Sequence, residues 1–163
     1  MQIIKERQIV DDHWHFVAPE VDSASPPAGD IVVTLSQWQR WREPLLARRA
    51  GALGVRLLGS DDLQPIVADL HHFALIALEF PTFRDGRAYS SARLLRDRYG
   101  YTGELRAIGD VLRDQLYYMS RVGFNAFALR ADQDIHHALQ AFAEISVRYQ
   151  ASHDEPRPLY RRR

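Results

Sequence analysis

The sequence predicts a single α/β domain built on a parallel sheet. Four apolar stretches of strand length alternate with helical patterns, which is typical of consecutive βα units. At 163 residues, 46% of them hydrophobic, the chain is long enough for one buried core. We expect about four βα units with right-handed crossovers, arranged as an open sheet or as half of a barrel. The four predicted strands are residues 54–58, 74–80, 104–109 and 124–130.

Residues 1–35 predict N-terminal strands followed by a loop. QIIKERQIV and HWHFV, between residues 2 and 17, have the composition of two short strands, and Asp11-Asp12 lies between them as in a hairpin. The Ser, Pro and Gly residues of 21–29 predict a loop, and DIVVTL that follows predicts another short strand.

Residues 36–51 predict a helix that covers one edge of the sheet. Ser36 and Gln39 form the Ser-x-x-Gln pattern of a capping box. Pro44 should kink this helix, because a proline inside a helix removes one hydrogen bond and clashes with the preceding turn. Gly51 or Gly54 is expected to end it.

Helix-start signals recur between the strands of the βα region, residues 54–149. Serine and aspartate are favoured N-cap residues, and glycine is favoured just after a helix. The expected N-caps are Ser60–Asp62, Ser90 or Ser91, Asp110, and Asp132 or Asp134, with Gly100 and Gly123 as stops. Residues 1–150 thus make one domain, and 150–163 are expected to form a flexible basic tail.

The balance of charge excludes whole classes of partner. Lys+Arg and Asp+Glu both number 21, so no global field favours nucleic acid or a membrane surface. Lys5 is the single lysine, and arginine is the side chain best shaped for bidentate contacts to oxyanions. We therefore expect a small anionic ligand as a candidate partner, and neither nucleic acid nor a membrane.

Cysteine is absent, which limits redox chemistry. Without thiols these residues cannot ligate an iron–sulfur cluster, form a thiolate zinc site or cycle a dithiol. The start MQIIKERQIV lacks the apolar run of a signal peptide, so a cytoplasmic location is expected. No G-x-G-x-x-G, P-loop, G-x-S-x-G or H-E-x-x-H motif occurs.

The connection FPTFRDGRAYS, residues 80–90, is the strongest candidate site. In parallel α/β sheets ligands bind beyond the carboxyl ends of the strands, and this connection follows a buried strand there. Arginine and the N–H groups at a helix start both donate to oxyanions. The predicted anion-binding residues are Arg84, Arg87, Tyr89, Ser90 and, from the next strand, Arg106.

Other roles for the same residues stay open. Asp85 and Asp110 are weak candidates for acid–base catalysis if their loops converge, although Asp110 is more simply an N-cap. Phe83 and Arg87 have the composition of a partner surface. Alternatively, Arg87 forms a structural ion pair with Asp85 or another carboxylate.

The chain resembles an uncharacterised bacterial family, domain of unknown function 934. Its members read F-P-x-F-x-D-G-R-x-Y-S, then L-R-x-R-Y-G-x-x-G-E-L-R-A-x-G-D-V-L-x-D-Q, then G-F-D-A-F. The matching positions here are 80, 81, 83, 85–87, 89, 90, 95, 96, 98–100, 103–107, 109–112, 114, 115, 123, 124, 126 and 127. Asn125 stands where the family usually has Asp.

This resemblance implies a context in sulfur metabolism. Such proteins are labelled oxidoreductases involved in sulfite reduction, and they are encoded beside the sulfite reductase haemoprotein. The resemblance therefore implies an accessory role in assimilatory sulfite reduction, with that haemoprotein as a partner. It assigns no catalytic residues, and a flavin stays open as a cofactor, because its phosphate needs no strict motif.

Overall fold

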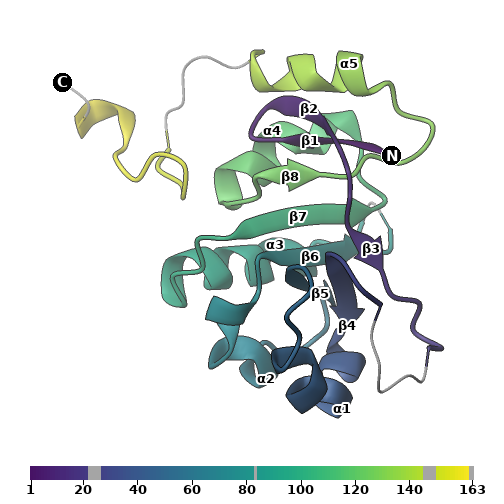
Figure 1. Ribbon diagram of the computed structural model, residues 1–163. Coiled ribbons are helices and arrows are strands. Elements are labelled where there is room, and N and C mark those ends of the chain that lie inside the picture. The colour runs from purple at the N-terminus through teal and green to yellow at the C-terminus, as the bar shows by residue number, and fades with distance from the viewer. Residues whose placement is uncertain (22–26, 83, 145–149, 162–163) are drawn as a thin grey trace.

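An eight-stranded sheet in the order β2-β1-β8-β7-β6-β5-β4-β3 runs through the protein (Figure 1). The computed structural model describes residues 1–21, 27–82, 84–144 and 150–161. The strands are β1 Gln2–Lys5, β2 Gln8–Asp11, β3 His15–Phe16, β4 Ile31–Thr34, β5 Leu53–Leu58, β6 Leu75–Phe80, β7 Glu104–Gly109 and β8 Ala126–Phe127. The α-helices are α1 Leu35–Leu46, α2 Gln64–Val67, α3 Arg87–Arg93, α4 Arg113–Val122 and α5 Ile135–Leu139. Short helical turns are η1 Leu70–His72, the π-helical η2 Leu94–Arg98, η3 Gln140–Phe142 and η4 Leu159–Arg161.

Strands β3 to β8 are all parallel, and each one pairs with the next in sequence. Because every crossover has the same hand, the helices collect on one face and the sheet curls as a half-barrel. Strand β1 pairs antiparallel with β8 and β2 antiparallel with β1, which extends the sheet at that end. The prediction of a single α/β domain is confirmed, and of the two predicted forms of the sheet, open or half-barrel, the half-barrel is the one observed.

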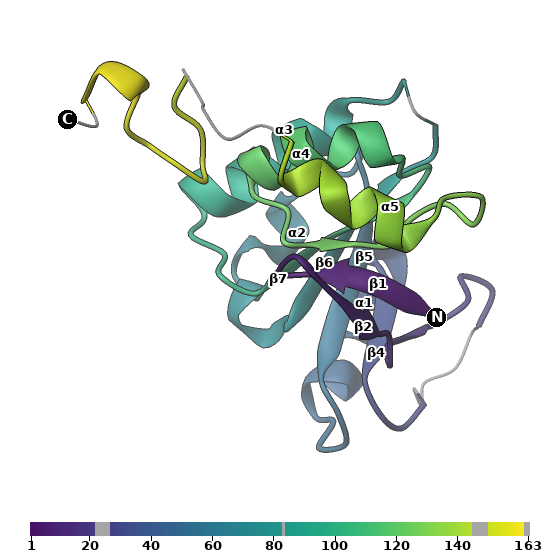
Figure 2. The ribbon, with the colours of Figure 1, turned by 90° about the horizontal axis from the view of Figure 1, so that it is seen from above.

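The main core lies between the convex face of the sheet and the helices. Alternate strand residues such as Leu78 and Ala107, which are register partners, point into it. Trp38 of α1 is buried there, with its ring 4.8 Å from that of Phe73. Seen from above, α3, α4 and α5 lie next to one another on this side of the strands (Figure 2).

Helix α1 confirms the predicted kink and corrects the predicted position of the capping box. Its capping box joins Thr34 to Gln37, two residues earlier than predicted, because β4 ends at Thr34 and its hydroxyl accepts the N–H of Gln37. The kink predicted from Pro44 is confirmed: Trp41, in the preceding turn, has φ −116° and ψ 24°.

The N-terminal hairpin turns at a different place from the predicted one. QIIKERQIV is itself the hairpin of β1 and β2, and Glu6 and Arg7 form its two-residue turn with φ of 49° and 61°. Positive φ is typical of Gly, Asn or Asp, so Glu-Arg gave no turn signal. The prediction of a turn at Asp11-Asp12 is therefore wrong.

Of the two later helix starts, one differs from the expectation and one agrees with it. Helix α4 begins after Leu112, whose N–H is capped by the side chain of Gln115, so the prediction that Asp110 caps it is wrong. Asp134 does cap α5, by accepting the N–H of His137, which confirms that prediction.

The concave face of the sheet is crossed by the connection between β2 and β3. These strands are the two edges of the sheet, yet only residues 12–14 link them, so the curl brings the edges close together. Under this connection Arg106 is 1% exposed, with Nη1 3.0 Å from Asp12 Oδ2 and Nε donating to Glu104 Oε1 over 2.7 Å. Lys5, which is 41% exposed, adds an ion pair to Glu104, so four charges form a network on the concave face.

Candidate functional site

The candidate connection at residues 80–90 is shorter than expected, because α3 begins inside it. Gly86 is the N-cap residue of α3, and Ser90 lies within the helix. The prediction that a serine caps this helix is therefore wrong. Asp85 supplies the local side-chain acceptor, since its Oδ1 accepts the backbone N–H of Arg87 over 3.2 Å.

Arg87, the central cation of the predicted anion site, is paired with Asp85. Its Nε donates to Oδ1 over 2.9 Å and its Nη2 to Oδ2 over 2.7 Å. Hydrogen bonds from the Arg87 side chain and backbone lower the pKa of Asp85 to about 2. Arg84 is exposed nearby, and Phe83 lies outside the described residues. An anion here would compete with Asp85, and anion binding by Arg84 and Arg87 stays a prediction.

Tyr89 faces inward and Ser90 faces outward. The Tyr89 ring lies 5.1 Å from the rings of both Phe80 and Tyr118 and 6.5 Å from that of Phe124. Burial, with Tyr118 nearby, raises the pKa of the Tyr89 hydroxyl. Ser90 is exposed on α3. Tyr89 therefore packs in an aromatic cluster, and a binding role for either residue stays a prediction.

Arg106 does not join the exposed arginines of this connection. It lies in the enclosed network of the concave face, where Asp12 and Glu104 occupy its guanidinium. The register of β7 explains this position, because Arg106 alternates with Leu105 and Ala107, which point into the main core.

The two candidate acid–base carboxylates are held by different arginines. Asp85 pairs with Arg87, whereas Asp110 accepts a hydrogen bond from Arg130 Nη1 over 2.7 Å. Arg130 also donates to Asp132, and this hydrogen bond is the main reason that the pKa of Asp132 is lowered to about 2. Acid–base catalysis by Asp85 or Asp110 stays a prediction.

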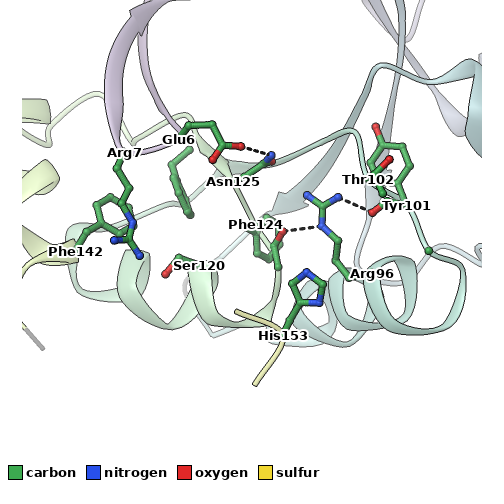
Figure 3. A pocket seen from close by; sticks show the side chains of 13 residues that line it. Glu6, Arg7, Arg96, Tyr101, Thr102, Ser120, Phe124, Asn125, Phe142 and His153 are labelled. Atoms are coloured by element: carbon green, nitrogen blue, oxygen red, sulfur yellow. Dashed lines mark hydrogen bonds between the residues drawn. The ribbon is translucent and has the colours of Figure 1, made fainter. Parts of the chain in front are cut away.

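A cavity of about 470 Å³ lies at the amino ends of the parallel strands, where β7 and β8 begin, opposite the carboxyl ends that carry residues 80–90 (Figure 3). Its volume is within the range of small-molecule sites. Four segments that are distant in the sequence meet around it: the β1–β2 turn, the chain before β7, the chain before β8 and the C-terminal segment. Its polar lining consists of Glu6, Arg7, Arg96, Thr102, Ser120, Asn125 and His153.

Arg96 anchors the floor of this pocket. Its Nε donates to the carbonyl of Gly123 over 2.9 Å, and its Nη1 donates to the carbonyls of Tyr101 and Gly103 over 2.6 and 2.9 Å. Among the described residues no hydrogen bond engages Nη2, and the guanidinium faces the cavity in Figure 3. Burial lowers the pKa of Arg96, but an arginine stays cationic at neutral pH. One edge of a partly buried cation is thus left for a ligand.

Arg7 reaches the pocket from the β1–β2 turn. The turn is held by Asn125, whose carbonyl accepts the N–H of Glu6 over 2.9 Å and whose Nδ2 donates to Glu6 Oε1 over 2.7 Å. The Arg7 guanidinium lies 5.9 Å from the centre of the Phe142 ring. Within the described part of the chain Arg7 forms no ion pair, so its charge is open to an anion.

Asn125 uses both ends of its amide to fix this wall. Its Oδ1 accepts the N–H of Leu105 over 2.7 Å, while its Nδ2 binds Glu6. A carboxylate in its place would keep the first contact and lose the second. Asn125, which stands where the family usually has Asp, therefore joins β7, β8 and the β1–β2 turn.

The other walls of the pocket are aromatic. Phe124, Phe127 and Phe142 are buried, and each presents part of its ring to the cavity. Tyr101 is also buried, which raises its pKa, and its hydroxyl donates toward the carbonyl of Phe73 over 3.1 Å. Two guanidinium groups above apolar walls suit an organic anion with an oxyanion head.

Sequence reasoning missed this pocket because it searched only the carboxyl edge of the sheet. The signal was nevertheless present in the motif residues: Arg96, Gly100, Gly123 and Asn125 all line the cavity. Gly100 and Gly123 have φ of 65° and 118°, which place them in the conformation that favours glycine. A partly buried arginine followed by two such glycines is the pattern to look for.

The described residues contain no cluster of three or more metal-ligating side chains. Nor does any helix within them have the length and apolar character needed to cross a membrane.

In a comparison with protein families, residues 54–160 match the family described as bacterial protein of unknown function (DUF934). Comparison with curated proteins and with solved structures gives no match. The matched range includes β5 from its second residue on, β6 to β8 and most of the pocket, but not the β1–β2 turn that carries Arg7.

Proposed function

We propose that this chain, which belongs to the DUF934 family of bacterial proteins, binds a small organic anion in the pocket between Arg7 and Arg96 and serves sulfite reduction as an accessory protein. The observation that carries the proposal is the pair of guanidinium groups that line one cavity of about 470 Å³. Within the described residues no hydrogen bond engages Arg96 Nη2 and no ion pair engages Arg7.

Arg96 is held rigidly and Arg7 is held loosely, and each of these properties favours ligand binding. Arg96 is fixed by three backbone carbonyls, so little entropy is lost when it binds an oxyanion. Arg7 is exposed and held by a cation–π contact to Phe142, so it can adjust to the ligand. Glu6 is the nearby anion, and Asn125 binds its carboxylate.

The sulfur context comes from the family resemblance. Sulfur oxyanions carry the flat or tetrahedral array of oxygens that guanidinium groups bind in pairs. The cavity is larger than a sulfite ion, so an adenylyl sulfate or a flavin nucleotide would also fit into it and contact its aromatic walls. In this role the protein supplies a ligand to the reductase.

Thermal-shift measurements with sulfite, sulfate, adenosine 5′-phosphosulfate and flavin mononucleotide test the proposal. A ligand at a hundred times its dissociation constant stabilises the protein by about 2.7 kcal/mol. Arg7→Ala should reduce the shift, because Arg7 is exposed and its loss leaves the fold intact. Arg84→Ala, which removes an exposed arginine at the other edge of the sheet, is the matched control and should leave the shift unchanged.

A second role, docking of the sulfite reductase haemoprotein, has one observation in its favour. Tyr118 on α4 is 56% exposed and its ring lies 5.1 Å from that of Tyr89 on α3, the helix that begins with the exposed Arg87. Tyrosine and arginine are enriched among the residues that dominate interfaces. We expect the purified reductase to be retained by the wild-type protein and less by Tyr118→Ala. Equal retention of both would remove this surface from the proposal.

A further inference from the structure

The C-terminal segment, residues 150–155, is fastened beside the pocket mainly through Arg121 of α4. The carbonyl of Arg121 accepts the N–H of His153 over 3.1 Å and the hydroxyl of Ser152 over 2.7 Å. Its guanidinium donates to the carbonyl of Gln150 over 2.5 Å and lies 3.4 Å from Asp154 Oδ1. One residue at the end of α4 thus holds four positions of the segment.

This fastening brings His153 to the pocket, where its ring lies beside Arg96 (Figure 3). The Nδ1 atom of His153 is 2.9 Å from Asp97 Oδ1, and Arg93 pairs with the same carboxylate group. Desolvation alone would raise the pKa of Asp97, but the hydrogen bonds from His153 and Arg93 outweigh it and lower that pKa. Asp97 is therefore an anion that orients the imidazole.

The orientation of the imidazole ring determines which nitrogen of His153 can contact a ligand. A neutral imidazole that donates through Nδ1 has only a lone pair at Nε2, whereas an imidazolium donates from both nitrogens. With Asp97 at Nδ1, Nε2 is the ring nitrogen of His153 that is left to contact a ligand beside Arg96.

We infer that residues 150–155 are a strap that completes the anion pocket, and that the strap and the ligand stabilise one another. The inference rests on the proposed function, since it assigns a closing element to the same site. If the anion binds the strapped form more tightly, linkage requires that the anion also hold the strap in place. Arg121 then acts as a positioning residue, because it touches the strap and not the ligand.

Isothermal titration with adenosine 5′-phosphosulfate, and separately with sulfite, tests this inference. His153→Ala should weaken binding at least about fivefold, the lower end of ordinary coupling between sites. Arg121→Ala should weaken it to a similar degree. His136→Ala, which removes an exposed histidine of α5, is the matched control and should bind as the wild type does.

Hydrogen exchange supplies the second readout. The ligand should slow exchange at the amides of Ser152 and His153, which bind carbonyls of Glu155 and Arg121. This readout uses the unaltered chain, so it holds even if Arg121→Ala fails to fold.

The outcomes separate the inference from the function on which it rests. If the wild type binds but both variants bind within twofold of it, or exchange is unchanged, the strap has no part in binding and the pocket stands. If only His153→Ala is weakened, the coupling through Arg121 is refuted. If the wild type binds neither probe, both the proposed function and the strap are refuted.

Discussion

Arg106→Ala is expected to be among the most damaging single changes in this protein. The side chain is 1% exposed, and it reaches two carboxylates whose side chains are each 5% exposed. Without the guanidinium, Asp12 loses its ion pair, while Glu104 keeps only the contact from Lys5 over 2.7 Å. Removal of one partner from a buried ion pair costs about 3–5 kcal/mol, because it leaves an uncompensated charge.

Arg56→Ala is the matched control. Arg56 also lies on the concave face, and its guanidinium makes two hydrogen bonds of 2.7 Å to Glu79. Its side chain is 32% exposed, so water can replace the lost contact and we expect a cost of about 1 kcal/mol.

Urea unfolding followed by circular dichroism measures both variants. At about 2–4 °C per kcal/mol for a chain of this size, Arg106→Ala should also lower Tm by about 6–20 °C. Adding Asp12→Asn to Arg106→Ala should recover part of the loss, because the orphaned charge is removed. The reasoning is refuted if Arg106→Ala costs no more than Arg56→Ala.

Three further changes test the pocket wall, the α3 turn and a helix cap. Asn125→Asp places a second carboxylate 2.7 Å from that of Glu6, so the free energy of unfolding should fall by about 1–2 kcal/mol near neutral pH. The loss should shrink at acid pH, where the two carboxylates share a proton, and measurements of stability as a function of pH check this. Arg87→Ala should return the pKa of Asp85 from about 2 toward its ordinary value in a carboxyl NMR titration. A lowered carboxyl pKa stabilises the folded state at higher pH, and this contribution is lost as the pH falls from about 4 to about 2. The variant should therefore lack this part of the wild type's dependence of stability on pH. Asp134→Ala should cost about 1 kcal/mol in urea unfolding, and an unchanged midpoint would show that the cap is not needed.

The arrangement of the sheet could be predicted because its causes are local. Strand β6 begins with four consecutive buried apolar residues, as is typical of a strand covered on both faces. Gly123 ends α4 in the left-handed conformation, with φ of 118°. The hairpin turn at Glu6 and Arg7 could not be predicted, because neither residue favours positive φ. That turn is stabilised by Asn125, which is more than a hundred residues away in the sequence.

The candidate site was predictable in kind but not in place. Arginine was rightly singled out, yet nothing local distinguishes Arg87, which pairs with Asp85 within its own turn, from Arg96, which binds carbonyls from two other segments. The choice depends on which strand ends meet, and therefore on tertiary structure. The same is true of Arg106, whose partner Asp12 lies in the β2–β3 connection that crosses the concave face of the sheet.

Mapping of amide chemical shifts during addition of adenosine 5′-phosphosulfate or sulfite tests the central claim most directly. The account predicts that the largest changes fall on the amino edge of the sheet, at Gly100, Gly123 and Asn125, and that Arg7→Ala reduces them. Changes centred on Arg87 at the carboxyl edge, or no changes with either anion, would contradict it.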